Sequence, residues 1–206
     1  MAASRQVDAV IFDVGHVLYD WDPRYLYAKL IPDPDRLDWF LDNVVTKSWH
    51  YQHDMGRPFA ETGPELIAQY PEEADLIALY GPRWLETIGD PMPGMMDLVR
   101  RIDEAGLPLF GITNFSAEFW TMFRPTAPIF DRFLDIIVSG AERMMKPDPA
   151  IYALAERRFA VDPPRALFID DQPRNIAAAK AHGFHAHRFE GRDSLDARLE
   201  TLGLAL

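Results

Sequence analysis

The sequence predicts an α/β fold in which a doubly wound, Rossmann-like parallel sheet carries an inserted helical cap. Short and almost continuously apolar runs recur along the chain, as expected of strands that are covered on both faces. From residue 91 onward, these runs alternate with segments whose apolar residues have helical spacing. Between the first run and about residue 90, only helical patterns occur. We therefore expect a core of residues 1–19 and 91–206 and a cap of residues 20–90.

Five apolar runs predict the strands of the sheet, and each is short enough to be a single buried strand. In chain order they are "AVIFDV" (9–14), "PLFGITN" (108–114), "DIIVSG" (135–140), "ALFIDD" (166–171) and, more weakly, "FHAHRF" (184–189).

Three segments of the core predict helices with recognisable ends. The spacing of apolar residues predicts a helix over 95–106 that stops at Gly106. Asp148 as N-cap and Pro149 in the first turn predict the start of a second helix over 147–159. A third helix begins at Pro173 and ends at Gly183.

The predicted cap contains three helical segments, over 35–45, 62–70 and 74–88. Thr62 and Glu65 are three residues apart, which fits a capping box at the start of the second segment. The segment "GDPMPG" (89–94) is rich in proline and glycine, and we expect it to be the linker back to the core.

Composition excludes several classes of function. The 206 residues include no cysteine, so disulfides, thiolate zinc sites and a cysteine nucleophile are absent. The net charge is −11 and the basic residues are scattered, which argues against a nucleic-acid partner. No apolar run is long enough to span a membrane, and the start of the chain lacks the apolar region of a signal peptide. We expect a cytoplasmic protein.

Polar residues follow several of the predicted strands at their carboxyl ends, where open α/β sheets bind ligands. Asp13 ends the first run, Thr113 and Asn114 end the second, and Asp170 and Asp171 end the fourth. Lys146 follows the third run. Each of these residues alone is typical of a turn or loop, but their shared placement predicts a common site.

Carboxylates brought together at a sheet edge repel one another unless a cation lies between them. Oxygen ligands without cysteine favour a hard cation such as Mg²⁺. A metal ion together with Lys146 and the amide of Asn114 suits an anion, above all phosphate. Asp13 is then the best candidate for a nucleophile that attacks phosphorus.

Four ordered motifs now show a resemblance to a known family. The segments "FDVGHVL", "ITN", "KPDPAIY" and "FIDDQPRNIAAAKAHG" resemble the motifs of the haloacid dehalogenase (HAD) superfamily of hydrolases. The helical stretch after the first motif resembles the helical cap of that superfamily's first subclass. The details are most similar to the alpha-glucose-1-phosphate phosphatase group and the N-terminal phosphatase domain of soluble epoxide hydrolases.

The resemblance implies a Mg²⁺-dependent hydrolase of small phosphate monoesters, with sugar phosphates among the candidate substrates. It implies that Asp13 becomes an aspartyl-phosphate and that Lys146 steadies both this nucleophile and the phosphoryl oxygens. Thr113 and Asn114 match the motif that contacts phosphate.

The same resemblance implies the residues that hold the metal ion. Asp13, the backbone carbonyl of Gly15 and Asp171 match its ligands. Asp170 either binds the ion or supports the site, and Asn175 matches a supporting residue.

Gly15 departs from the pattern of most phosphatases in the superfamily, which have at this position an Asp that acts as general acid and base. A glycine cannot transfer a proton, and loss of such a group typically slows a reaction by about 10²–10⁴-fold. Three explanations stay open. The substrate has a good leaving group, such as an anomeric sugar phosphate; another group, such as His16 or a cap residue, supplies the proton; or the phosphatase activity is weak. The glucose-1-phosphate phosphatase group also has Gly here.

Two other functions compete with the phosphatase. A metal-independent 2-haloacid dehalogenase also lacks the second Asp, but Asp170 and Asp171 would repel its carboxylate substrate in a site without metal. A non-catalytic HAD-like binding protein would keep the metal site without turnover. The charge argument favours the phosphatase.

The cap segment "SWHYQHDMG" (48–56) has two interpretations. It is either a substrate-binding segment, with Trp49, Tyr51 or above all His53 facing the active site, or a helix end with packed aromatic residues. Residues 20–22 could lie at the same entrance, but the pattern favours an ordinary loop.

Overall fold

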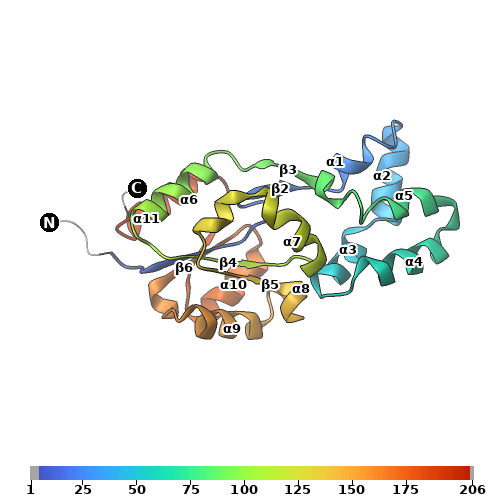
Figure 1. Cartoon of the computed structure of the whole chain (residues 1–206). Helices are drawn as coiled ribbons and strands as arrows, with labels where there is room; N and C mark the ends of the chain where they lie inside the picture. The colour runs from blue at the N-terminus through green and yellow to red at the C-terminus, as the bar shows by residue number, and fades with distance from the viewer. Residues whose placement is uncertain (1–4, 205–206) are drawn as a thin grey trace.

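The computed structural model describes residues 5–204 and contains a five-stranded parallel sheet (Figure 1). The strands lie in the order β5-β4-β1-β6-β7. Their bounds are Ala9–Phe12 for β1, Leu109–Thr113 for β4, Asp135–Val138 for β5, Ala166–Asp170 for β6 and His185–Arg188 for β7. Each coincides with a predicted run, so the predicted α/β parallel sheet is confirmed.

Helices cover both faces of this sheet because alternate residues of each strand point to opposite sides. Val10 and Phe12 of β1 belong to one apolar cluster with buried residues of α6 (Met95–Glu104), α7 (Ala117–Phe123) and α11 (Arg192–Thr201). Ala9 and Ile11 belong to a second cluster with α9 (Pro149–Phe159) and α10 (Pro173–His182). Figure 1 shows α6 and α11 on one side of the sheet and α9 on the other. A short helix, α8 (Ser139–Glu142), follows β5.

The core helices α9 and α10 begin and end as the sequence predicts. The carboxylate of Asp148 accepts a hydrogen bond from the backbone N–H of Ala150, and Pro149 is the first residue of α9. Gly183 ends α10 in the left-handed conformation at φ 109°. Short 3₁₀ helices connect other elements, at η3 (Arg124–Thr126), η4 (Pro128–Arg132) and η5 (Pro163–Arg165). In the described part of the chain, the helices are too short or too polar to cross a membrane.

Residues 22–87 form a mainly helical region, which we call the helical insertion, at one end of the sheet (Figure 1). Its helices are α1 (Arg24–Tyr27), α2 (Pro34–Asn43), α3 (Lys47–Asp54), α4 (Phe59–Gln69) and α5 (Ala74–Ala78), with 3₁₀ helices η1 (Pro71–Glu73) and η2 (Trp84–Thr87).

Two expectations for this region are wrong. The segment 74–88 contains two separate helical pieces, α5 and η2, instead of one helix. Thr62 does not cap α4, because this helix already begins at Phe59 with Pro58 at the N-cap position. Thr62 therefore lies inside α4, and its hydroxyl is free to bond elsewhere.

Two short strands also lie where the sequence predicts none. β2 (Tyr19–Trp21) pairs antiparallel with β3 (Ile88–Pro91), so the chain enters and leaves the helical insertion through one two-stranded ribbon. The predicted linker 89–94 thus begins inside a strand. Strands of three and four residues that are only partly buried carry too little alternation to be recognised in the sequence.

Candidate active site

Lys146 joins two carboxylates at the carboxyl ends of the central strands. Its Nζ lies 2.8 Å from Oδ2 of Asp13, directly after β1, and 2.7 Å from Oδ2 of Asp170, the last residue of β6. The same ammonium donates to the carbonyl of Ile112 at 2.7 Å. Lys146 is fully buried. Burial alone would lower its pKa, but the negative charges of Asp13 and Asp170 outweigh that effect and raise it, so the lysine stays protonated.

Asp170 has a complete set of hydrogen-bond partners. The side-chain amide of Asn175 donates to both of its carboxylate oxygens at 3.0 Å, and the backbone N–H of Gln172 donates to Oδ1 at 2.8 Å. With the ammonium of Lys146 added, this carboxylate is fixed from several sides. Asp170 and Asn175 thus form a rigid support beneath Lys146.

Asn114 orients the loop that carries Lys146. Its side-chain amide accepts from the backbone N–H of Lys146 at 2.8 Å and donates to the carbonyl of Lys146 at 2.9 Å. Asn114 also lines the pocket above the strand ends. Thr113, its neighbour, ends β4 and is buried, and it is not among the residues that line this pocket.

Asp171 completes a cluster of three acids. Asp13, Asp170 and Asp171 each have a carboxylate oxygen within 4.8 Å of the others. Burial raises the pKa of the Asp13 carboxyl, and Asp170 and Asp171 add to this rise while Lys146 opposes it. Burial and the charge of Asp170 likewise raise the pKa of Asp171. Three carboxylates against one ammonium leave excess negative charge, which a divalent cation with oxygen ligands would balance.

Gly15 lies in the turn after Asp13 and lines the same pocket. A Cβ atom at this position would have no neighbour within 4 Å, so the turn does not exclude a side chain for lack of space. Within residues 5–204, the Gly15 carbonyl accepts none of the backbone hydrogen bonds that close this turn. It is thus available as a further oxygen ligand beside Asp13 and Asp171.

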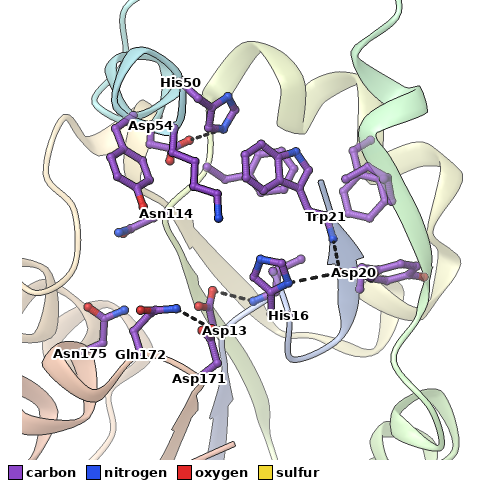
Figure 2. Close-up of a pocket in the computed structure, with 18 of the residues that line it drawn as sticks. Asp13, His16, Asp20, Trp21, His50, Asp54, Asn114, Asp171, Gln172 and Asn175 are labelled. Carbon is purple, nitrogen blue, oxygen red and sulfur yellow. Dashed lines mark hydrogen bonds and ion pairs between the residues drawn. The ribbon is translucent and has the colours of Figure 1, made fainter. Parts of the chain in front are cut away.

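The pocket lies between the strand ends and the helical insertion (Figure 2). Polar groups of the core line one side, and aromatic or aliphatic side chains line much of the rest: Tyr19, Trp21, Trp84, Ile88, Phe115 and Phe123. Asp20 and Trp21 line it too, so the interpretation of residues 20–22 as an ordinary loop is corrected for these two. The carboxylate of Asp22 instead accepts from the backbone N–H of Arg24 at the start of α1.

His53, the strongest sequence candidate in the helical insertion, does not line the pocket. Its side chain is fully buried, and its Nε2 lies 2.7 Å from the hydroxyl of Thr62 in α4. Burial lowers the pKa of His53 to about 4, so it is neutral near pH 7. The expectation that His53 contacts substrate is therefore corrected: in this structure its side chain packs between helices. Trp49 is also buried, whereas Tyr51 does line the pocket.

The same helix instead directs His50 and Asp54 to the pocket. Figure 2 shows both residues on the opposite side of the pocket from Asp13 and Asp171. Their spacing of four residues places them on one side of the helix, and the ring of His50 also packs against that of His53, with ring centroids 5.5 Å apart. That spacing, just before a glycine at position 56, is the available sequence signal, and it is obscured because Trp49 and His53 are buried beside His50 and Asp54 on the same broad face of α3.

A family model for haloacid dehalogenase-like hydrolases matches residues 7–183 of the chain. The sesquiterpene phosphatase astK of Aspergillus oryzae is 24% identical over 187 residues, which cover 85% of this chain and 86% of that protein. An (S)-2-haloacid dehalogenase of Pseudomonas putida is 31% identical over 112 residues, about half of each protein (52% and 49%).

Solved structures share the fold. The HAD family enzyme BT-2542 of Bacteroides thetaiotaomicron, in complex with magnesium and inorganic phosphate, superposes with a TM-score of 0.69 at 19% identity. The match covers 90% of this chain and 95% of that one. Together with the family model, which spans most of the sequence, this shows that the chain belongs to the haloacid dehalogenase-like hydrolases.

Proposed function

We propose that this hydrolase cleaves small phosphate monoesters in a Mg²⁺-dependent reaction through an aspartyl-phosphate on Asp13. The observation that carries the proposal is the charge balance at the strand ends, where three carboxylates cluster and one ammonium group pairs with two of them. A metal-free site of this charge would repel an anionic substrate, whether phosphate or carboxylate. Asp13, Asp171 and the Gly15 carbonyl would hold the ion, which would screen the charge between the nucleophile and the phosphoryl group.

The residues of the core have distinct roles in this proposal. Lys146 favours the ionised form of Asp13 and holds it in place at 2.8 Å, and its charge stabilises the phosphoryl oxygens. Asp170 and Asn175 keep Lys146 in position. The side-chain amide of Asn114 lines the pocket and is a candidate donor for phosphate, with Thr113 at the strand end beside it.

The helical insertion and the adjoining parts of β2 and β3 act as a cap over this site, and this cap comprises residues 20–90. The aromatic side chains along the pocket suit the apolar face of a substrate, either a sugar ring or an alkyl chain. The phosphatase relative that covers most of the chain supports a phosphorylated small molecule as substrate.

Phosphate release from a panel of sugar, alkyl and aryl phosphates tests the proposal, with Mg²⁺ and again with EDTA. We expect release that needs the metal and that Asp13→Asn abolishes. Asp193→Asn is the matched control, because Asp193 is exposed on α11. Chloride release from 2-chloropropionate in EDTA would instead identify a dehalogenase, and Mg²⁺-dependent thermal stabilisation without any turnover would identify a binding protein.

A further inference from the structure

The proposed reaction needs a proton transfer at each of two stages, and Gly15 has no side chain that could carry out either transfer. An alkyl phosphate leaves as an alkoxide unless an acid protonates its oxygen, and the water that hydrolyses the aspartyl-phosphate must lose a proton. A residue that does this work must reach the space next to Asp13 and must have a proton to give near neutral pH.

Asp54 faces that space from the helical insertion. It is the last residue of α3, it is 4% exposed, and it lines the same pocket as Asp13. Figure 2 shows Asp54 on the opposite side of the pocket from Asp13. When Asp13 attacks the phosphorus of a substrate in line, the leaving ester oxygen lies on the side of phosphorus away from Asp13, which is the side of Asp54.

The core fixes the end of α3 at the site. The hydroxyl of Ser139, at the start of α8, donates to the backbone carbonyl of Asp54 at 2.6 Å and accepts from the backbone N–H of Phe115 at 2.9 Å. Gly56 and Gly140 allow two segments of the backbone to lie in contact here, since a Cβ on Gly56 would lie 2.6 Å from the Gly140 carbonyl oxygen. Asp54 is therefore held against the core although it belongs to the helical insertion.

The surroundings of Asp54 favour a carboxyl group that carries its proton. Within residues 5–204, no group hydrogen-bonds its Oδ1, and the nearest partner is Nε2 of His50 at 3.5 Å. Burial keeps His50 neutral by lowering its pKa to about 3, and the hydroxyl of Tyr80 lies 2.6 Å from its Nδ1. No cation thus compensates Asp54 at close range. Burial, together with the charge of Asp13, raises the pKa of Asp54 to about 8, against the weaker opposing effects of Lys146 and the Ser116 N–H.

We propose that Asp54 is the general acid and base of this site, in place of the side chain that Gly15 lacks. The inference rests on the proposed function. As an oxygen of Asp13 bonds to phosphorus, the bond from phosphorus to the ester oxygen breaks, and the carboxyl of Asp54 gives that oxygen its proton. The alcohol then leaves. The Asp54 carboxylate next takes a proton from the water that attacks phosphorus, the bond to Asp13 breaks, and inorganic phosphate and a protonated Asp54 result.

His16 is the other candidate in the pocket, and its contacts fit the role less well. Its side chain is 44% exposed, and its Nδ1 lies 3.3 Å from Oδ1 of Asp20. It follows Gly15 directly and lies on the core side with Asp13, as Figure 2 shows. A variant at His16 therefore belongs in the test.

The leaving group tells proton transfer apart from a structural role. n-Hexyl phosphate needs a proton on its leaving oxygen, whereas p-nitrophenyl phosphate releases a stable anion. With Mg²⁺ present, we expect Asp54→Asn to lower kcat for n-hexyl phosphate by about 10²–10⁴-fold. With p-nitrophenyl phosphate, the same variant should release about one equivalent of p-nitrophenolate per enzyme in a rapid burst and then turn over slowly, because the aspartyl-phosphate accumulates.

Asp42→Asn, an exposed acid on α2, is the matched control and should behave as the unaltered protein. The inference is overturned if Asp54→Asn keeps turnover of n-hexyl phosphate within about threefold, or if it loses the burst as well, which would show a damaged site. It is also overturned if His16→Asn gives the expected pattern instead. Failure of the proposed function is distinct, because the unaltered protein would then show no Mg²⁺-dependent release, or Asp13→Asn would keep the burst.

Discussion

The two sides of the pocket differ in how their buried polar groups are paired. On the core side, Lys146 and Asp170 each have several close partners, all between 2.7 and 3.0 Å. On the side of the helical insertion, Asp54 has a neutral histidine at 3.5 Å and an oxygen without a hydrogen bond. Close partners on both carboxylate oxygens fix the charge and position of Asp170, whereas an incompletely paired acid such as Asp54 can change its protonation at little structural cost. The core side thus provides a fixed electrostatic environment, and the side of the helical insertion provides a group suited to proton transfer.

Removal of Lys146 is the strongest way to break this comparison. Lys146→Met leaves two buried carboxylates without their cation, and we expect a loss of about 3–5 kcal/mol in the free energy of unfolding. Urea unfolding followed by circular dichroism measures it. Lys180→Met, at an exposed position of α10, should unfold like the unaltered protein. If Lys146→Met does not fold, adding Asp170→Asn should restore part of the stability; equal midpoints for Lys146→Met and the unaltered protein would contradict the argument.

Mg²⁺ should stabilise the core side specifically. A ligand that binds only the folded state adds about 2.7 kcal/mol at a concentration 100 times its Kd. We expect thermal unfolding to shift upward with MgCl₂ and this shift to vanish in Asp171→Asn. Asp54→Asn should retain it, since Asp54 is not part of the acidic cluster. A shift that survives Asp171→Asn would place the ion elsewhere.

The close contact between the two sides can be tested through a pair of glycines. Gly56 and Gly106 both have positive φ, at 93° and 73°, so alanine at either position strains the backbone by about 1–2 kcal/mol. Only at Gly56 would the added Cβ meet backbone, at 2.6 Å, whereas at Gly106 it meets nothing within 4 Å. We expect Gly56→Ala to be the less stable variant by a further ~1–3 kcal/mol. It should also lower turnover of n-hexyl phosphate, which Gly106→Ala should not.

The last prediction concerns the pH dependence of stability that Asp54 causes. Its pKa rises from 3.8 in the unfolded chain to about 8 in the folded one, so the folded state binds the proton more tightly. Its contribution to stability is fully present below about pH 4 and is lost as pH rises through about 8. In EDTA at pH 9, Asp54→Asn should therefore have a larger free energy of unfolding than the unaltered protein, and at pH 4 the difference between the two should be much smaller. A stability difference that does not change with pH would contradict the raised pKa.

The sequence predicted the core better than the helical insertion, for a physical reason. Strands such as β1 and β6 are fully buried and read as unbroken apolar runs, and their ends place Asp13 and Asp170 at one edge. Parallel pairing of these two strands then determines that the acids meet. This rule alone therefore predicts that these residues, although far apart in the sequence, lie close together in the fold.

The same reasoning failed in α3 because the buried face of this helix is broad. Trp49, His50, His53 and Asp54 are all buried, so periodicity could not tell which face meets the pocket and which meets α4. The rotation of α3 is determined by contacts with Thr62, Tyr80 and Ser139, which lie in other elements. The sequence pattern therefore favours His53 as the pocket residue, although His50 and Asp54 line the pocket.

The ribbon of β2 and β3 affects how the segment inserted between these two strands can change in length and sequence. Trp21 pairs with Ile88, so the chain returns within one strand spacing of the point where it left the core. The hydrogen-bonded register of the five-stranded sheet does not involve the 66 residues numbered 22–87. Segments of other lengths can therefore replace these residues without a change in the strand register that positions the nucleophile. If Asp54 supplies the proton, such an exchange would alter the acid–base step together with substrate choice, so that the two would be inherited as one unit.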